Sequence, residues 1–113
     1  MYEVLKVGKE VYPIRFGMNA LRKYTKRQNI TLGELGNIGE TITLDDACVL
    51  ILCGIEDGCR KAKRDVTITV EDIADALDDD MTIVEKAMEI FTEAFAPKNE
   101  GNSKGGAKTP RKK

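Results

Sequence analysis

The sequence predicts an α+β domain that is mostly helical, with an N-terminal β-hairpin followed by about four helices and a disordered C-terminal tail. Three observations predict it: two short runs of alternating apolar residues, helical periodicity over most of the remaining chain, and a loss of apolar residues after Pro97. A chain of 113 residues has the length of one domain. We therefore place the domain at residues 1–97 and the disordered basic tail at residues 98–113.

Two runs rich in β-forming residues, at residues 2–7 and 10–16, flank the dipeptide Gly8-Lys9. A two-residue break that contains glycine between such runs is typical of a β-hairpin. Pro13 cannot donate a backbone hydrogen bond, so the second strand should be an edge strand or should bend there. Because an isolated hairpin is only marginally stable, it must lie against an apolar surface.

Residues 17 to about 28 show the period of an amphipathic helix. Its apolar half comprises Met18, Ala20, Leu21 and Tyr24, and its basic half comprises Arg22, Lys23, Lys26 and Arg27. Asn29 is a suitable residue for its C-terminal end. Thr31 and Glu34 then predict the capped start of a short helical turn.

The strongest helical pattern covers residues 44 to about 62, after the capping residue Thr43. One side of this helix repeats apolar residues with helical spacing, and Val49, Leu50 and Cys53 lie on the other side. A helix that is apolar nearly all round is either central in a core or shared between a core and an interface.

Two further helices are predicted before Pro97. The first begins at the cap Thr69 and carries the stripe Val70, Ile73, Ala74 and Leu77. We expect Asp78-Asp79-Asp80 to end it and to cap the second helix, at about residues 81–96. The stripe of that second helix is formed by Val84, Met88, Phe91 and Phe95.

The net charge of −1 hides a division of charge along the chain. Residues 98–113 hold six basic and one acidic side chain, a net charge of +5, whereas residues 1–97 hold 12 basic and 18 acidic side chains, a net charge of −6. Such asymmetry indicates a separate role for the tail or a tail that is only solvated. The basic helix face and tail could meet phosphate, but no aromatic residues are interleaved with them, so nucleic-acid binding is not the favoured interpretation.

Several kinds of chemistry have no support in the residue types. The sequence has no His, which excludes His-based catalysis and His metal ligands. Cys48, Cys53 and Cys59 lack zinc-site spacing, so we expect buried free thiols in a reducing cytoplasm. The acidic pairs beside Thr residues are explained by helix capping. We therefore expect no enzyme, no cofactor and no metal site, and the longest apolar run, at residues 47–54, is too short to span a membrane.

The surplus of apolar residues on the two long helices is either available to another chain or covered by the rest of the fold. The pattern favours neither alternative. If the surface is free, the candidate partner-binding residues are Val49, Leu50, Cys53, Phe91 and Phe95.

Three segments carry a resemblance to a known family. The strand end Tyr12-Pro13-Ile14-Arg15-Phe16 runs into Gly17-Met18-Asn19-Ala20-Leu21, and is followed by Thr31-Leu32-Gly33-Glu34-Leu35 and then by Val70-Glu71-Asp72-Ile73-Ala74-Asp75. This order resembles the tail assembly chaperones of long-tailed bacteriophages and prophages over about residues 2–96. Its most specific part is the stretch Tyr-Pro-Ile-Arg-Phe-Gly.

The resemblance implies a non-enzymatic protein that binds the tape measure protein and helps tail tube assembly. Its implied location is the host cytoplasm, with no place in the mature virion. The tail tube protein and a second copy of this chain are further candidate partners, and no membrane is expected. The alternative from another class is a small nucleic-acid-associated phage or regulatory protein that uses the basic helix and tail.

Overall fold

The computed structural model describes residues 2–36, 38 and 42–95, and these contain one β-hairpin and five helices. This confirms the predicted α+β, mostly helical class. The predicted end of the last helix at Pro97 and the basic segment 98–113 lie outside the described residues. The elements are β1 (Glu3–Val7), β2 (Glu10–Ile14), α1 (Met18–Gln28), α2 (Leu32–Leu35), α4 (Leu44–Ala62), α5 (Val70–Asp79) and α6 (Thr82–Phe95).

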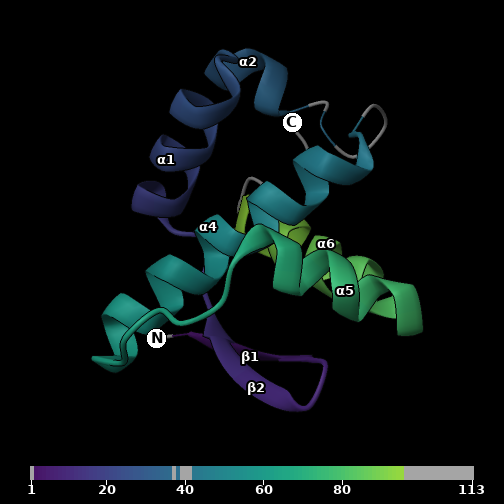
Figure 1. Cartoon of the computed structure of the whole chain (residues 1–113). Coiled ribbons are helices and arrows are strands. Elements are labelled where there is room, and N and C mark those ends of the chain that lie inside the picture. The colour runs from purple at the N-terminus through teal and green to yellow at the C-terminus, as the bar shows by residue number, and fades with distance from the viewer. Residues whose placement is uncertain (1, 37, 39–41, 96–113) are drawn as a thin grey trace.

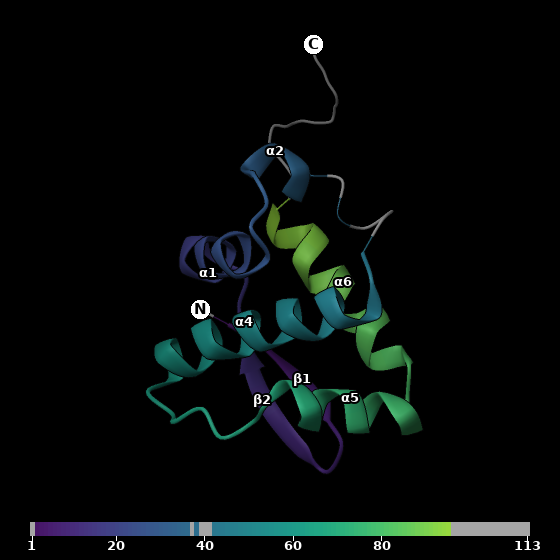
Figure 2. The same cartoon turned by 45° about the horizontal axis from the view of Figure 1, so that its top comes forward.

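Helix α4 crosses the centre of the molecule, with α1 and α2 on one side of it and the hairpin on the other (Figure 1). Helices α5 and α6 lie beside the hairpin and the first half of α4, and the end of α6 points toward α2 (Figure 2). The predicted alternative in which the long helix is central in the core is therefore the one that the structure adopts.

The hairpin pairs β1 and β2 antiparallel, from Glu3 opposite Ile14 to Val7 opposite Glu10. Gly8 has a φ of +66°, at the first turn position, where a type II′ hairpin turn takes glycine. Pairs alternate between hydrogen-bonded and non-hydrogen-bonded along such a ladder, so Pro13 falls in a non-hydrogen-bonded pair. The proline therefore costs the two-stranded sheet no ladder bond, as expected for an edge strand.

Strand β2 packs directly on the backbone of α4 at two glycines. A Cβ on Gly58 would lie 2.4 Å from the carbonyl carbon of Pro13, and one on Gly54 would lie 2.7 Å from the Phe16 ring. The amide of Arg15 donates a hydrogen bond of 2.9 Å to the carbonyl oxygen of Gly54. No larger residue fits this contact without moving the strand away from the helix.

The predicted helix ends are confirmed in most cases. Asn29 ends α1 in the left-handed region, and the side chains of Thr43 and Thr69 accept hydrogen bonds from the first turns of α4 and α5. The prediction that all three aspartates end α5 was wrong, because α5 continues through Asp79. Asp80 alone has an extended backbone, and its carboxylate accepts a 3.0 Å hydrogen bond from the amide of Thr82.

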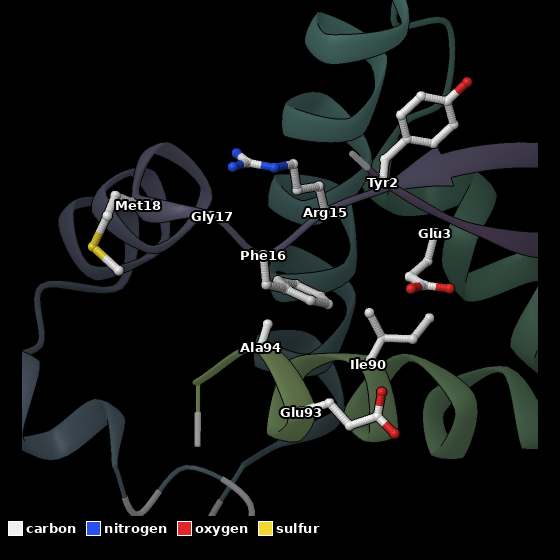
Figure 3. Close-up of a pocket in the computed structure, with 9 residues that line it drawn as sticks. All are labelled: Tyr2, Glu3, Arg15, Phe16, Gly17, Met18, Ile90, Glu93 and Ala94. Carbon is white, nitrogen blue, oxygen red and sulfur yellow. The ribbon is translucent and has the colours of Figure 1, made fainter. Parts of the chain in front are cut away.

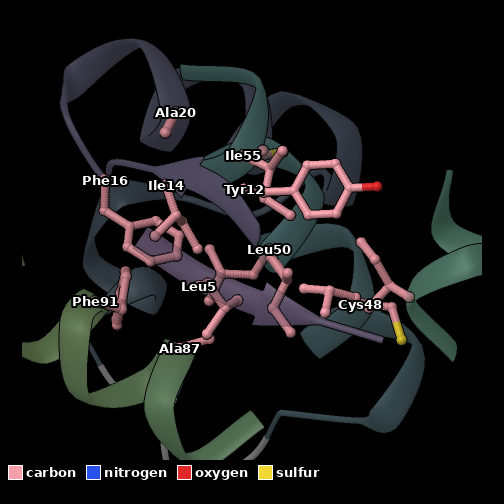
Figure 4. Packing of buried hydrophobic residues seen from close by; sticks show 14 of the residues in the cluster. Leu5, Tyr12, Ile14, Phe16, Ala20, Cys48, Leu50, Ile55, Ala87 and Phe91 are labelled. Carbon is pink, nitrogen blue, oxygen red and sulfur yellow. The ribbon is translucent and has the colours of Figure 1, made fainter. Parts of the chain in front are cut away.

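The core lies where β1, β2, α4 and α6 meet (Figure 4). Leu5 and Ile14 from the hairpin are at most 2% exposed, and they pack with side chains from α4 and α6 in one cluster. The rings of Phe16 and Phe91 meet edge-to-face with centroids 5.5 Å apart. This contact joins the end of the hairpin to α6.

Replacing Gly58 with alanine tests the contact between β2 and α4. Gly58→Ala is expected to lower the free energy of unfolding by about 2 kcal/mol or more, because the added methyl group collides with strand backbone. Gly33→Ala is the matched control, since a Cβ there meets nothing closer than 3.8 Å. The control should change stability by less than about 1 kcal/mol. Urea unfolding measures both, and equal midpoints for Gly58→Ala and the wild type would contradict the close packing.

Candidate functional site

The five residues predicted to bind a partner do not form a free surface. Leu50, Cys53 and Phe91 are 1%, 0% and 4% exposed, so of the two alternatives left open by the sequence the structure adopts the one in which the fold covers these side chains. Val49 and Phe95 are half-buried and pack against the same core. The reason is that the hairpin, α1 and α6 surround α4, which leaves its second apolar side covered.

A groove lies instead between the start of β1, the start of α1 and the end of α6 (Figure 3). It has a volume of about 500 Å³. The buried ring of Phe16 points toward Ile90 and Ala94 and forms the floor with them, and Met18 and Tyr2 lie at opposite ends. Glu3, Glu93, Arg15 and Gly17 complete the lining.

The largely apolar side chains at the two ends of the groove are exposed to solvent. Met18 is 75% exposed and Tyr2 is 44% exposed. The sequence placed Met18 on the apolar half of its helix, and the other members of that half, Ala20, Leu21 and Tyr24, are indeed buried. The expectation was wrong for Met18 because it is the first residue of α1, at the end of the helix that borders the groove.

A buried carboxylate holds the segment that forms one wall of the groove. Asp57 of α4 is 2% exposed. Its Oδ2 accepts hydrogen bonds from Nη1 of Arg15 (3.0 Å) and from the amide of Gly17 (3.2 Å), and its Oδ1 accepts one from Nη2 of Arg60 (2.7 Å). Burial acts to raise the pKa of the Asp57 carboxyl, but the hydrogen bonds from these three partners outweigh burial and lower the pKa. The carboxylate is therefore charged and fixes the turn from β2 into α1.

A side chain at Gly17 would compete for space with the ion pair of Arg15 and Asp57. A Cβ on Gly17 would lie 2.1 Å from Nη1 of Arg15 and 2.9 Å from Oδ2 of Asp57. Its φ of −85° is one that any residue adopts, so the restriction is the closeness of the guanidinium and not the backbone conformation. A larger residue before Met18 would therefore have to displace the guanidinium of Arg15 from Asp57.

The predicted basic face of α1 is partly neutralised by α4. Nη2 of Arg27 lies 3.0 Å from Oε1 of Glu56 and donates a hydrogen bond of 3.2 Å to its Oε2, and Nζ of Lys23 lies 3.8 Å from Oε1. Residues 70–95 hold nine acidic side chains and one basic side chain, a net charge of −8. These charges disfavour a nucleic-acid surface on α5 and α6.

The cysteines are buried free thiols, as predicted. Cys53 is 0% exposed, and its Sγ accepts a hydrogen bond of 3.3 Å from Nη1 of Arg27. Burial raises the pKa of the Cys53 thiol to about 11, although the Arg27 charge acts in the opposite direction. Such a thiol is a poor nucleophile at neutral pH.

Within the described residues, no three Cys, Asp or Glu side chains lie together in a way that could hold a metal ion. None of the helices that the structure describes has the length and apolar character needed to cross a bilayer. What the described surface does offer is the groove, with an apolar floor and two acidic side chains.

No protein-family model, curated protein or solved structure was found that matches this chain. The groove is therefore assigned from the residues and geometry of this chain. Of its lining residues, Arg15, Phe16 and Gly17 belong to the stretch from Tyr12 to Gly17 that the sequence analysis singled out.

Periodicity could not have found the groove, because its residues come from three elements. One signal was nevertheless present in the sequence. Gly54, Asp57 and Gly58 have the i, i+3, i+4 spacing of one face of the most apolar helix, and a carboxylate on a face that glycines leave open to close packing requires a cationic partner. Arg15, in the distinctive stretch before the first helix, is that partner.

Asp57→Asn tests whether the buried carboxylate fixes the turn. It is expected to lower the free energy of unfolding at pH 7 by about 1–3 kcal/mol, because charge-assisted hydrogen bonds from two arginines are weakened. Since folding lowers the pKa of Asp57, the carboxylate stabilises the fold above the usual Asp pKa of about 3.9, and this stabilisation is lost as the pH falls through the lower, folded-state pKa. Urea unfolding at pH 7 and at about pH 3 should therefore show a smaller difference between wild type and variant at the lower pH.

The matched control for this substitution is Asp75→Asn, which neutralises an exposed carboxylate of α5. It should change the free energy of unfolding by less than about 0.5 kcal/mol at pH 7. A loss of stability in Asp57→Asn that is the same at both pH values would contradict an ionic role for Asp57.

Thiol reactivity tests the burial of the cysteines. Cys53 is expected to react with Ellman's reagent at about pH 8 more than about 100-fold more slowly in the folded protein than in urea, because only the exposed thiolate attacks the reagent. Cys48 and Cys59 are 2% and 0% exposed and should be protected as well. Rapid reaction of any of the three thiols in the folded protein would show that α4 is accessible.

Proposed function

We propose that this protein is a non-enzymatic tail assembly chaperone that binds the tape measure protein in the host cytoplasm and helps tail tube assembly. The observation that carries the proposal is the groove, where Met18 and Tyr2 are exposed beside the apolar floor formed by Phe16, Ile90 and Ala94. An apolar groove next to a helix suits the apolar face of a partner helix. A chaperone of this kind leaves the partner before the mature virion is complete.

The position of the groove in the sequence supports the proposal. The stretch that most resembles tail assembly chaperones ends in Arg15-Phe16-Gly17, and these three residues line the groove next to Met18. A single groove of this size gives only a weak contact, but a long helical partner can bind many copies of a small chaperone. Weak individual contacts also allow the copies to be displaced as the tube assembles.

Other partners follow from the same proposal and can be tested with purified components. The tail tube protein is a candidate because the chaperone acts while the tube assembles. A second copy of the chain is another candidate, and its binding would appear as a concentration-dependent mass.

Two methionine substitutions test the proposal. Met18→Lys and Met81→Lys make the same chemical change at exposed positions, which are 75% and 55% exposed, and only Met18 lines the groove. Met18→Lys should weaken binding to the tape measure protein by about tenfold or more, because the apolar contact of one methionine is worth roughly 1.5–3 kcal/mol. Met81→Lys should bind like the wild type.

The measurement is co-expression of each variant with the tape measure protein encoded in the same genome. The wild type and Met81→Lys are expected to keep the tape measure protein soluble and to purify as a complex with it. Met18→Lys should leave most of it insoluble while folding normally itself. A tape measure protein that stays insoluble with the wild type would sink the proposal.

A further inference from the structure

Three charged side chains surround the apolar floor of the groove, and they are not equivalent. Nη1 of Arg15 lies 3.0 Å from the buried carboxylate of Asp57, so part of its charge is compensated within the fold, although Asp57 also pairs with Arg60. In Figure 3 this side chain extends away from α6. Glu3 and Glu93 are exposed and line the groove itself. The charge that an incoming chain meets is therefore negative.

Helix α6 extends the negative charge beyond the groove. Ile90, Glu93 and Ala94 face the groove with the spacing of one helix face, and Glu89 lies one turn before Glu93 in an adjoining hollow. Residues four apart on a helix are separated by about 6 Å along its axis. A partner helix that lies along α6 with basic residues at the same spacing would meet a carboxylate at each turn.

The chain's own segments fit this groove poorly. The basic segment 98–113 has Ala107 as its only apolar residue, so it has no side chain to fill the apolar floor. A second copy docked groove to groove about a two-fold axis would bring Glu3 and Glu93 of both copies into one interface. Like charges held together in this way oppose binding.

We infer that the groove selects an amphipathic helix of another protein whose apolar stripe is flanked by lysine or arginine, with apolar side chains over Phe16 and Ile90 and basic side chains against Glu3 and Glu93. This inference rests on the proposed function, because it specifies which segments of the tape measure protein bind. The apolar stripe supplies the contact, and the acidic side chains of the groove select the helix by its flanking charge.

The probes are two labelled synthetic peptides of about 14 residues, or four helical turns. Both carry the same stripe of leucines, and the flanking positions are all lysine in one peptide and all glutamate in the other. Fluorescence anisotropy with the full-length chain should show that the lysine peptide binds about tenfold or more tightly in about 0.05 M salt. The ratio of the two peptide affinities should shrink in about 0.5 M salt, where the Debye length is several times shorter and exposed charges attract one another less. A third peptide, with lysine flanks and serine in place of leucine, should not bind.

Two charge-reversal variants test whether the preference for the lysine peptide arises at the groove. Glu93→Lys should weaken binding of the lysine peptide by about tenfold and strengthen binding of the glutamate peptide. Asp75→Lys changes the net charge of the chain by the same amount on α5 and should alter either affinity less than about twofold. Both residues are exposed, so both variants should fold.

The other outcomes overturn either the inference or the proposed function, and the experiment distinguishes the two. Equal affinities of the two leucine peptides would show that the groove has no charge preference. Equal effects of Glu93→Lys and Asp75→Lys would show that the preference comes from the net charge of the chain and not from the groove. If neither peptide binds although the tape measure protein is kept soluble, the inference is wrong while the proposed function stands. If the lysine peptide binds through Glu93 but the tape measure protein stays insoluble, the groove stands and the proposed function fails.

Discussion

The contact of β2 with α4 at Gly54 and Gly58 is the constraint on which the rest of this fold depends. Sheets and helices usually pack through two layers of side chains, but here the strand backbone touches the helix backbone, and the amide of Arg15 donates to the carbonyl of Gly54. That approach brings Asp57, which lies between the two glycines, within reach of the turn that follows β2. The turn is then held by hydrogen bonds from Arg15 and Gly17 to one carboxylate.

The groove takes its shape from this contact. Because the turn is fixed, Phe16 is held with its ring between α4 and α6, where it meets Phe91 edge-to-face. Met18 follows at the first position of α1, beyond the part of that helix that packs on α4. A small movement of β2 away from α4 would thus displace the floor and one end of the groove together, although neither Gly54 nor Gly58 lines it.

The elements were predictable because their signals are local. A glycine in the hairpin turn and threonines at the starts of α4 and α5 each act on backbone groups within a few residues. The covering of α4 was not predictable in the same way. Periodicity shows that Leu50 and Cys53 share a side of the helix, but only the arrangement of α1, α6 and the hairpin determines whether that side is buried.

The site was less predictable than the fold because it depends on contacts between distant parts of the chain. Asp57 bonds to residues 42 and 40 positions away, and the groove joins residues near Tyr2 to residues near Ala94. Helical periodicity places Met18 on the same side of α1 as its buried residues. It gives no information on whether the first residue of a helix extends past the element on which the helix packs.

The same geometry separates binding from folding. The core and the Asp57 bonds maintain the fold, whereas Met18 and Glu93 are exposed and contribute little to it, so a change at either position alters what the groove binds without altering the structure that forms it.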